Sequence, residues 1–330
     1  MLKFIDGFDQ LRDVSSDGSP SVLEGYLNAS GYTATGAVSV DVGREQEQRC
    51  LKLGDGTAAV GSLKRVFTSS QTKVAIGFAY SATAKRNNIV VIPNLGTLAW
   101  DESTGKISMA NGVGTATILL GLWYYFEIVV DKTNSLLQVY VNNGKDIEVA
   151  LPSTAQFLTT YDCTWSSAAD DAKKLDDLYF LDSETGKYVD RIGPISIQSR
   201  MPTNDVDKEW SPSTGTQHWP LVANQPPKDT DYIQSNTSGA IDTFLSNTGV
   251  PAGAQVLAVG MTVLNKKSDI DARQLGMVVG QKGQTQKEVV DVNLSTSPKY
   301  SYAVFESAPG DAAWTAVNVT TIPFGVIVRP

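Results

Sequence analysis

The chain has 330 residues, 42% of them hydrophobic and 19% charged, so it can bury a large core and is not a disordered tail. At about 150 residues per domain, this length suggests two domains. The 35 acidic residues outnumber the 27 basic ones, and the formal net charge of −8 excludes a surface made for nucleic acid or an anionic membrane.

The first residues predict a strand rather than a leader. Segment 1–6 reaches an acid at Asp6 and never builds the apolar run of a secretory signal. The longest apolar stretch, 118–125, is far below the roughly 20 residues that span a bilayer. We therefore expect a soluble protein made in the cytosol.

Short segments with period-two alternation follow one another along the first half of the chain, which indicates β-strands. The one helix candidate is segment 21–28, which has Pro20 before it and Gly31 after it. Turn residues separate the strands at short intervals, a spacing typical of a two-sheet antiparallel sandwich. The predicted strands are 3–8, 50–53, 73–80, 88–93, 95–101, 106–110 and 175–182.

The clearest feature is a meander over 123–151. Its first strand places Phe126 and Ile128 on a core face, and Tyr125 and Glu127 on an outward face. The turn 142–144, Asn-Asn-Gly, supplies residues that tolerate positive φ. We expect Phe126→Asp to abolish folding and Glu127→Gln to be nearly silent.

Cysteine and histidine are too scarce for most catalytic or metal chemistry. Cys50 and Cys163 fit neither a disulfide framework nor a zinc spacing, and we interpret them as small buried hydrophobes. The single histidine, His218, excludes multi-histidine metal sites and lies in a turn-rich segment where catalysis is not expected. We predict no catalytic, cofactor-binding or metal-binding residues.

A domain boundary is predicted at the polar turn 183–186, which gives domains 1–184 and 185–330. Residues 203–227 form a Trp/Pro-rich loop, either packed by its own aromatics or used for contact. The second half is also β, with predicted strands at 255–264, 275–279, 288–294, 300–305 and 324–328.

An ordered series of motifs resembles virion proteins of tailed bacteriophages over nearly the whole chain. Pro194 departs from that pattern and predicts a bend or a sheet edge. The motifs are 4–9 (Phe-Ile-Asp-Gly-Phe-Asp), 43–51, 122–127 (Leu-Trp-Tyr-Tyr-Phe-Glu), 141–144, 176–179, 192–195, 201–203, 210–213, 215 with 218–219, 231–232 and 313–315.

The resemblance implies an all-β fold, in which an N-terminal concanavalin A-like or laminin G-like jelly roll precedes a smaller C-terminal antiparallel β-sandwich. It implies a non-enzymatic structural protein on the virion exterior, a head decoration, collar or tail component, synthesised in the host bacterial cytoplasm. Its partners would be capsid, neck or tail proteins. Symmetry favours a homo-oligomer, with a trimer as the expected number. Contacts are expected at Trp210, His218, Trp219 and Trp314, and the two terminal strands are expected to be donated to neighbours.

The alternative function is a carbohydrate-binding, lectin-like module for a host surface glycan. Trp100, Tyr125 and Tyr140 are then the candidate stacking platforms. The one acidic cluster, Asp170, Asp171, Asp176 and Asp177, is interpreted as a solvated turn; calcium remains open, but no calcium-loop spacing occurs.

A glycoside hydrolase is the third alternative. Hydrolysis needs two carboxyl groups roughly 5 to 9.5 Å apart. Glu127 and Asp131 share a strand face but should lie about 13 Å apart at roughly 3.3 Å per residue. Asp176 and Asp177 are adjacent and should point to opposite faces.

Overall fold

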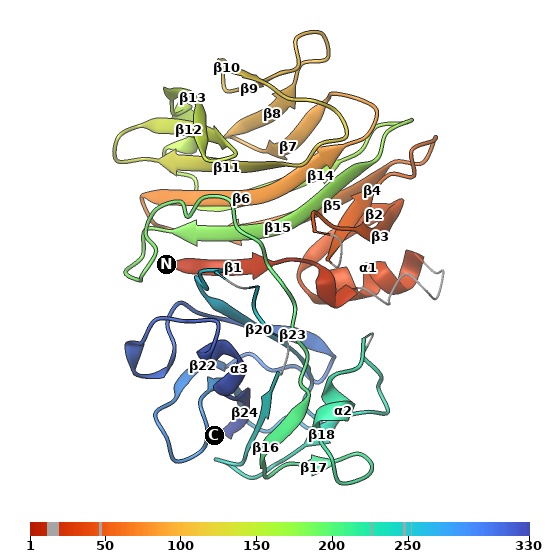
Figure 1. Ribbon diagram of the computed structural model, residues 1–330, viewed down its shortest axis with the longest axis vertical. Coiled ribbons are helices and arrows are strands. Elements are labelled where there is room, and N and C mark those ends of the chain that lie inside the picture. The colour runs from red at the N-terminus through yellow and green to blue at the C-terminus, as the bar shows by residue number, and fades with distance from the viewer. Residues whose placement is uncertain (12–19, 46–47, 226, 247–248, 252) are drawn as a thin grey trace. The chain divides into compact units, whose positions relative to one another are not determined.

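The structure, a computed structural model, describes residues 1–11, 20–45, 48–225, 227–246, 249–251 and 253–330. It divides into unit 1, Met1–Ser199, and unit 2, Arg200–Pro330. Antiparallel strands dominate both units, which confirms the all-β prediction (Figure 1). Within the described ranges, no helix has the length and apolar character needed to cross a membrane.

Unit 1 is a sandwich of an eight-stranded and a seven-stranded sheet. The eight-stranded sheet has the order β13-β12-β11-β6-β15-β4-β3, and β1 pairs with β15; the seven-stranded sheet has the order β10-β9-β8-β7-β14-β5-β2. The strands are β1 (Leu2–Asp6), β2 (Tyr32–Gly36), β3 (Val38–Val42), β4 (Arg49–Leu53), β5 (Gly61–Thr68), β6 (Lys73–Ala82), β7 (Asn88–Ile92), β8 (Gly96–Trp100), β9 (Lys106–Met109), β10 (Gly112–Thr117), β11 (Tyr124–Asp131), β12 (Leu136–Val141), β13 (Gly144–Ala150), β14 (Thr160–Ser166) and β15 (Lys173–Asp182). The helices are η1 (Asp9–Leu11), α1 (Pro20–Ala29) and η3 (Ser153–Ala155).

Aromatic side chains from both sheets fill the core of the sandwich. Phe78 on β6 meets Trp165 on β14 edge to face, with 5.5 Å between ring centroids, and Phe126 packs beside Phe78. Phe67 and Phe180 stack with their centroids 4.5 Å apart. The predicted inward phase of Phe126 is confirmed, because this side chain is fully buried between the sheets.

Turn chemistry and cysteine placement also follow the prediction. Asn142 and Asn143 both have positive φ in the tight turn between β12 and β13. Cys50 and Cys163 are free and fully buried, the first on β4 and the second on β14, so they lie on different sheets. Burial raises the pKa of both thiols, which keeps them protonated and unreactive.

Unit 2 is a smaller antiparallel sandwich. A five-stranded sheet with the order β16-β19-β24-β21-β22 accompanies the pairs β17-β18 and β20-β23. Its core includes Met261, Met277, Phe305 and Trp314. The elements are β16 (Asn204–Lys208), β17 (Ser211–Pro212), α2 (Trp219–Val222), β18 (Ile233–Gln234), β19 (Ile241–Leu245), β20 (Val259–Asn265), β21 (Gln274–Val279), β22 (Lys287–Asp291), β23 (Lys299–Phe305), η4 (Pro309–Asp311), α3 (Asn318–Thr321) and β24 (Phe324–Arg329).

Three details of the structure differ from the sequence-based expectation. The division between the units falls after Ser199, later than the predicted boundary at 184/185. The expected loop 203–227 contains β16, β17 and α2, because β16 pairs with β19 and β17 with β18. The terminal strands are not free for donation: β1 pairs with β15, and β24 lies between β19 and β21.

Candidate functional site

An irregular segment of residues 188–199, here called the strap, crosses the outer face of the eight-stranded sheet. The strap leaves the region of β15 as the green coil in front of the sheet (Figure 1). Asp190 pairs with Lys73 on β6 at 2.7 Å, and Ser199 at the far end donates its backbone N–H to Asp9. The strap therefore covers the middle of a face that the sequence predicts to be open to solvent.

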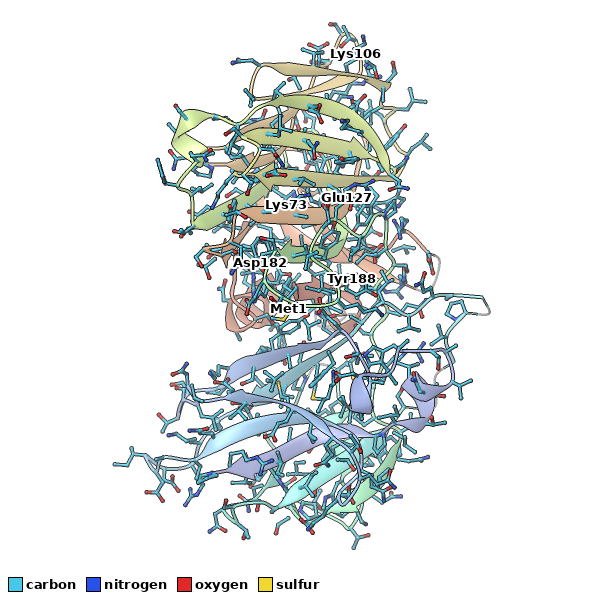
Figure 2. All side chains as sticks on the ribbon, turned by 90° about the vertical axis from the view of Figure 1, so that its left-hand side faces the viewer. Met1, Lys73, Lys106, Glu127, Asp182 and Tyr188 are labelled. Atoms are coloured by element: carbon cyan, nitrogen blue, oxygen red, sulfur yellow. The ribbon has the colours of Figure 1, made fainter. Side chains whose placement is uncertain are left out.

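Glu127 on β11 is the first anchor of the strap. Its Oε1 accepts hydrogen bonds from the Tyr179 hydroxyl at 2.6 Å and from the Gly193 backbone N–H at 2.8 Å. Its Oε2 forms an ion pair with Arg191 Nη1 at 2.6 Å. Figure 2 places Glu127 and Lys73 on neighbouring strands of this sheet. Both carboxylate oxygens are thus engaged, and the side chain is fully buried.

Asp176 and Asp177 on β15 form the second anchor. The strand bulges between Asp176 and Tyr179, and Asp177 has a φ of 49°. Asp177 accepts the backbone N–H of Ile197 at 2.7 Å and pairs with Arg44 Nη2 at 2.9 Å, while Asp176 accepts the backbone N–H of Arg44 at 3.2 Å. The bulge corrects the expectation that the two carboxyl groups point to opposite faces, because it breaks the alternation where they lie.

Burial controls the acid–base behaviour of this pair. Removal from water raises the pKa of both Asp176 and Asp177, and the neighbouring carboxylate raises that of Asp176 further. The Arg44 guanidinium opposes the shift at Asp177. The two groups therefore titrate as a pair, with ionisation favoured at Asp177, beside the guanidinium.

The sequence correctly predicts which side chains of β11 point away from the core, but it wrongly predicts that they are exposed to solvent. Tyr125 and Glu127 do point away from the sandwich core, yet both are buried, because the strap and the loop that carries Arg44 cover them. Tyr125 donates its hydroxyl hydrogen to the Asp177 carbonyl at 3.0 Å. It is not available as a stacking platform for a sugar.

Several other predicted contact residues are also buried. Trp100 and Trp314 bond through their indole N–H groups to the carbonyls of Gly105 and Phe305. His218 is buried against Asp242, which also accepts two backbone N–H groups. Burying a large ring is favourable because it removes much apolar surface from water, so these side chains lie in the interior and are not open to a partner.

Trp210 and Trp219 keep part of their rings at the surface of unit 2. Trp210 is half-buried and donates its indole N–H to the Ala240 carbonyl at 3.0 Å. Trp219 is half-buried at the start of α2, where Asp205 accepts its backbone N–H. The two residues remain candidates for contact with a partner.

Tyr140 is the one predicted platform in unit 1 with an accessible edge. It is half-buried on β12, and the guanidinium of Arg191, a strap residue, sits over one face of its ring, 3.8 Å from the centroid. Gln138 donates to Glu148 at 2.7 Å, and Lys145 pairs with Glu148 at 2.6 Å. We call Gln138, Tyr140, Asn143, Lys145 and Glu148 the Tyr140 patch.

The Tyr140 patch has the chemistry of a site for a hydroxyl-rich ligand. It combines the edge of an aromatic ring with an amide, a carboxylate and an ammonium group, which together can both donate and accept hydrogen bonds. Asn143 and Lys145 are exposed at the end of the hairpin, so a ligand can approach from solvent.

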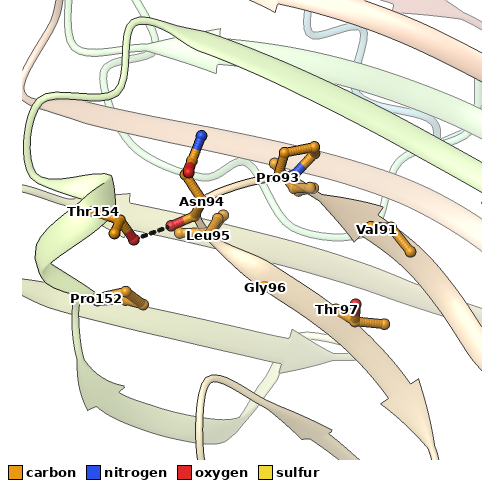
Figure 3. A pocket seen from close by; sticks show the side chains of 9 residues that line it. Val91, Pro93, Asn94, Leu95, Gly96, Thr97, Pro152 and Thr154 are labelled. Atoms are coloured by element: carbon orange, nitrogen blue, oxygen red, sulfur yellow. Dashed lines mark hydrogen bonds between the residues drawn. The ribbon is translucent and has the colours of Figure 1, made fainter.

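A shallow depression of about 360 Å³ lies at the turn between β7 and β8. Its lining includes Pro93, Asn94, Leu95 and Pro152, and the Thr154 hydroxyl donates to the Asn94 carbonyl at 2.8 Å (Figure 3). Its lining residues carry no aromatic ring and no charged group, so it offers less for recognition than the Tyr140 patch.

The predicted acidic cluster is not a solvated turn as a whole. Asp170 is exposed, but Asp171 is buried and accepts the backbone N–H groups of Ala84 and Lys85, and Asp176 and Asp177 are buried as described above. Backbone donors at these oxygens do not fit a calcium ligand set. In the described part of the chain, no group of three or more His, Cys, Asp or Glu side chains is arranged to hold a metal ion.

No protein-family model and no curated protein matches the sequence. Solved structures with a similar fold include a sialidase (16% identity, TM-score 0.38), which matches 54% of this chain, while this chain covers 18% of that one. A protein of unknown function with a galectin-like fold from Bacillus subtilis matches 55% of this chain and 97% of its own length (10% identity, TM-score 0.37).

The carbohydrate recognition domain of Emp46p in its metal-free form matches 47% of this chain and 88% of its own length (8% identity, TM-score 0.35). The structures that this chain resembles thus include lectin-type and galectin-like β-sandwiches. The chain is an all-β protein built as two antiparallel sandwiches. At these identities and TM-scores, the likeness carries no function over to this chain.

Proposed function

We propose that this chain is a non-enzymatic carbohydrate-binding protein that holds a glycan at the Tyr140 patch. The observation that carries the proposal is the position of Tyr140: its half-buried ring is held from one side by Arg191 of the strap and lies beside the polar side chains of Gln138, Lys145 and Glu148. Sugar rings are recognised through contacts with aromatic rings and a few convergent polar groups.

The carboxyl groups of the same face support binding rather than hydrolysis. Glu127 and Asp177 each accept a backbone N–H from the strap and face an arginine, and both lie beneath the strap. A glycosidase acid needs access to the scissile oxygen, and its partner carboxylate needs access to the sugar or to a water. These groups hold the chain together instead.

A glycan array followed by calorimetric titration of the selected sugar tests the proposal on the full chain. Tyr140→Ala and Gln138→Ala should each weaken binding at least about tenfold, because each removes a contact of about 1.4 kcal/mol or more. Phe157→Ala, at an 89% exposed aromatic residue of unit 1 outside the patch, is the matched control and should bind like the wild type. Binding that survives both patch substitutions, or no binding by the wild type, contradicts the proposal.

The second candidate is the exterior virion protein that the sequence motifs resemble, produced in the bacterial cytoplasm and docked on capsid, neck or tail proteins. Val289 and Val290 are exposed at an edge strand of unit 2, and such an edge favours contact with another protein. Mass spectrometry of purified particles and labelling of the chain in an electron-microscopy map test this function; absence from particles contradicts it.

A further inference from the structure

We propose that β22 is the strand through which two copies of this chain pair edge to edge, so that the five-stranded sheets of two copies of unit 2 join about a twofold axis. This inference does not depend on carbohydrate binding. β22 is the last strand of its sheet and pairs with β21 along one edge. In the part of the chain that the structure describes, no strand pairs with the other edge of β22. A free edge of this kind is a ready template for another strand.

Exposed valines lie among the charged residues of this edge. Val289 and Val290 are 37% and 38% exposed, and Val292, directly after the strand, is 60% exposed. The charges of β22 stand at its two ends, Lys287 and Glu288 at one and Asp291 at the other, and leave the valines between them uncovered. A second strand laid alongside β22 would cover these valines and satisfy its outward backbone groups.

The sequence of β22 is self-complementary in charge, and this selects a second copy as the occupant. Antiparallel pairing centred on Val289 sets Lys287 opposite Asp291 of the second copy. Pairing centred on Glu288 instead sets that carboxylate opposite its own copy. Opposite charges favour the first register and like charges disfavour the second.

The existing ion pairs of unit 2 extend this pattern. Lys287 pairs with Asp311 at 2.6 Å, and Asp291 pairs with Lys299 at 2.8 Å. In the proposed register, Lys287 of one copy lies beside Asp291 of the other, so positive and negative side chains alternate along the interface. Each charged side chain can keep the ion pair that it already forms within its own copy. The paired surface is small because the strand is short, so the dimer should be weak and should depend on concentration.

Sedimentation of the full chain over a wide concentration range tests the proposal. The substitutions are made at residue 289, because this residue lies opposite residue 289 of the second copy at the twofold axis. We expect the wild type to pass from monomer to dimer. Val289→Lys and Val289→Glu should each remain monomeric, since each places two like charges face to face, and an equimolar mixture of the two variants should recover the dimer. Val113→Lys, at a 66% exposed valine of the edge strand β10, is the matched control and should dimerise like the wild type.

Hydrogen exchange of residues 287–291 in the wild type provides a measurement without substitutions. Protection should rise with protein concentration in this segment. A wild type that stays monomeric, an oligomer that Val289→Lys leaves intact, or variants that fail to recover the dimer on mixing would each overturn the proposal.

Discussion

Tyr179 on β15 reaches Glu127 on β11 across the intervening strand β6, and Gly77 makes this possible. Gly77 is aligned with both residues, and a methyl group at its Cα would lie 2.0 Å from the Tyr179 ring. The ring therefore lies flat over the glycine and brings its hydroxyl within 2.6 Å of Glu127. This arrangement fixes the carboxylate that anchors the strap.

The outward phase of Glu127 predicts a nearly silent Glu127→Gln change, but the burial of this side chain reverses that expectation. The change should destabilise unit 1 by about 3 kcal/mol, because it leaves Arg191 without its anionic partner in a largely buried position. The value belongs at the lower end of the range for buried pairs, since the Arg191 side chain is 22% exposed. Urea denaturation measures the effect. Glu148→Gln, in an exposed ion pair with Lys145, is the control and should leave the urea midpoint nearly unchanged. Equal effects would show that the burial of Glu127 does not matter.

Gly77→Ala should lower the free energy of unfolding by about 3 kcal/mol, because the added methyl group displaces the Tyr179 ring and breaks its bond to Glu127. The control is Gly25→Ala in α1, where no atom lies within 4 Å of the added group. That change should stabilise the protein by about 0.5–1 kcal/mol through helix propensity. A neutral Gly77→Ala variant would refute the proposed role of Gly77.

The Asp176 and Asp177 pair should make unit 1 less stable as the pH rises. Burial raises the folded-state pKa of both groups above the ordinary value of 3.8, so the folded state holds protons more tightly than the unfolded state does. This contribution is fully present below about pH 4 and is lost as the pH rises through the raised folded-state pKa. Comparing urea midpoints at about pH 5, 7 and 9 should show Asp176→Asn gaining stability relative to the wild type at high pH. A difference that does not change with pH would contradict the assignment.

A fragment that ends at Ser199 should fold, whereas one that ends at residue 187 should be less stable and expose apolar surface. The shorter fragment lacks the backbone donors of Gly193 and Ile197 and uncovers Tyr125 and Tyr179. Circular dichroism melts and dye binding to exposed hydrophobic surface distinguish the two fragments. Equal melting temperatures would mean that the strap does not stabilise the sandwich.

Much of the strand framework could be predicted because it depends on local alternation. The meander over β11, β12 and β13 has the phase that its side chains indicate, and Asn142 and Asn143 adopt the positive φ that the turn requires. β14 escaped prediction although Tyr161, Cys163 and Trp165 alternate inward along it. That signal was available in the sequence.

The strap could not be predicted from periodicity. Its backbone N–H groups bond to Glu127 and Asp177, which are distant in sequence, and no repeat in residues 188–199 marks those bonds. The sheet beneath the strap carried a weaker signal: Tyr125 is a large aromatic residue at a position assigned to solvent, and such a residue indicates a covering segment. The bulge at Asp177 is likewise set by tertiary contacts with Arg44 and Ile197.

The position of β24 constrains the order in which unit 2 can form during synthesis. Because β24 lies between β19 and β21, each of these strands lacks one of its two partners until residues 324–329 have left the ribosome. β16 and β19 must wait as an unfinished pair while later segments are made, and this delay exposes apolar surface to chaperones. Unit 1 has all of its strands by Asp182 and its strap by Ser199, so it can fold while unit 2 is still being translated.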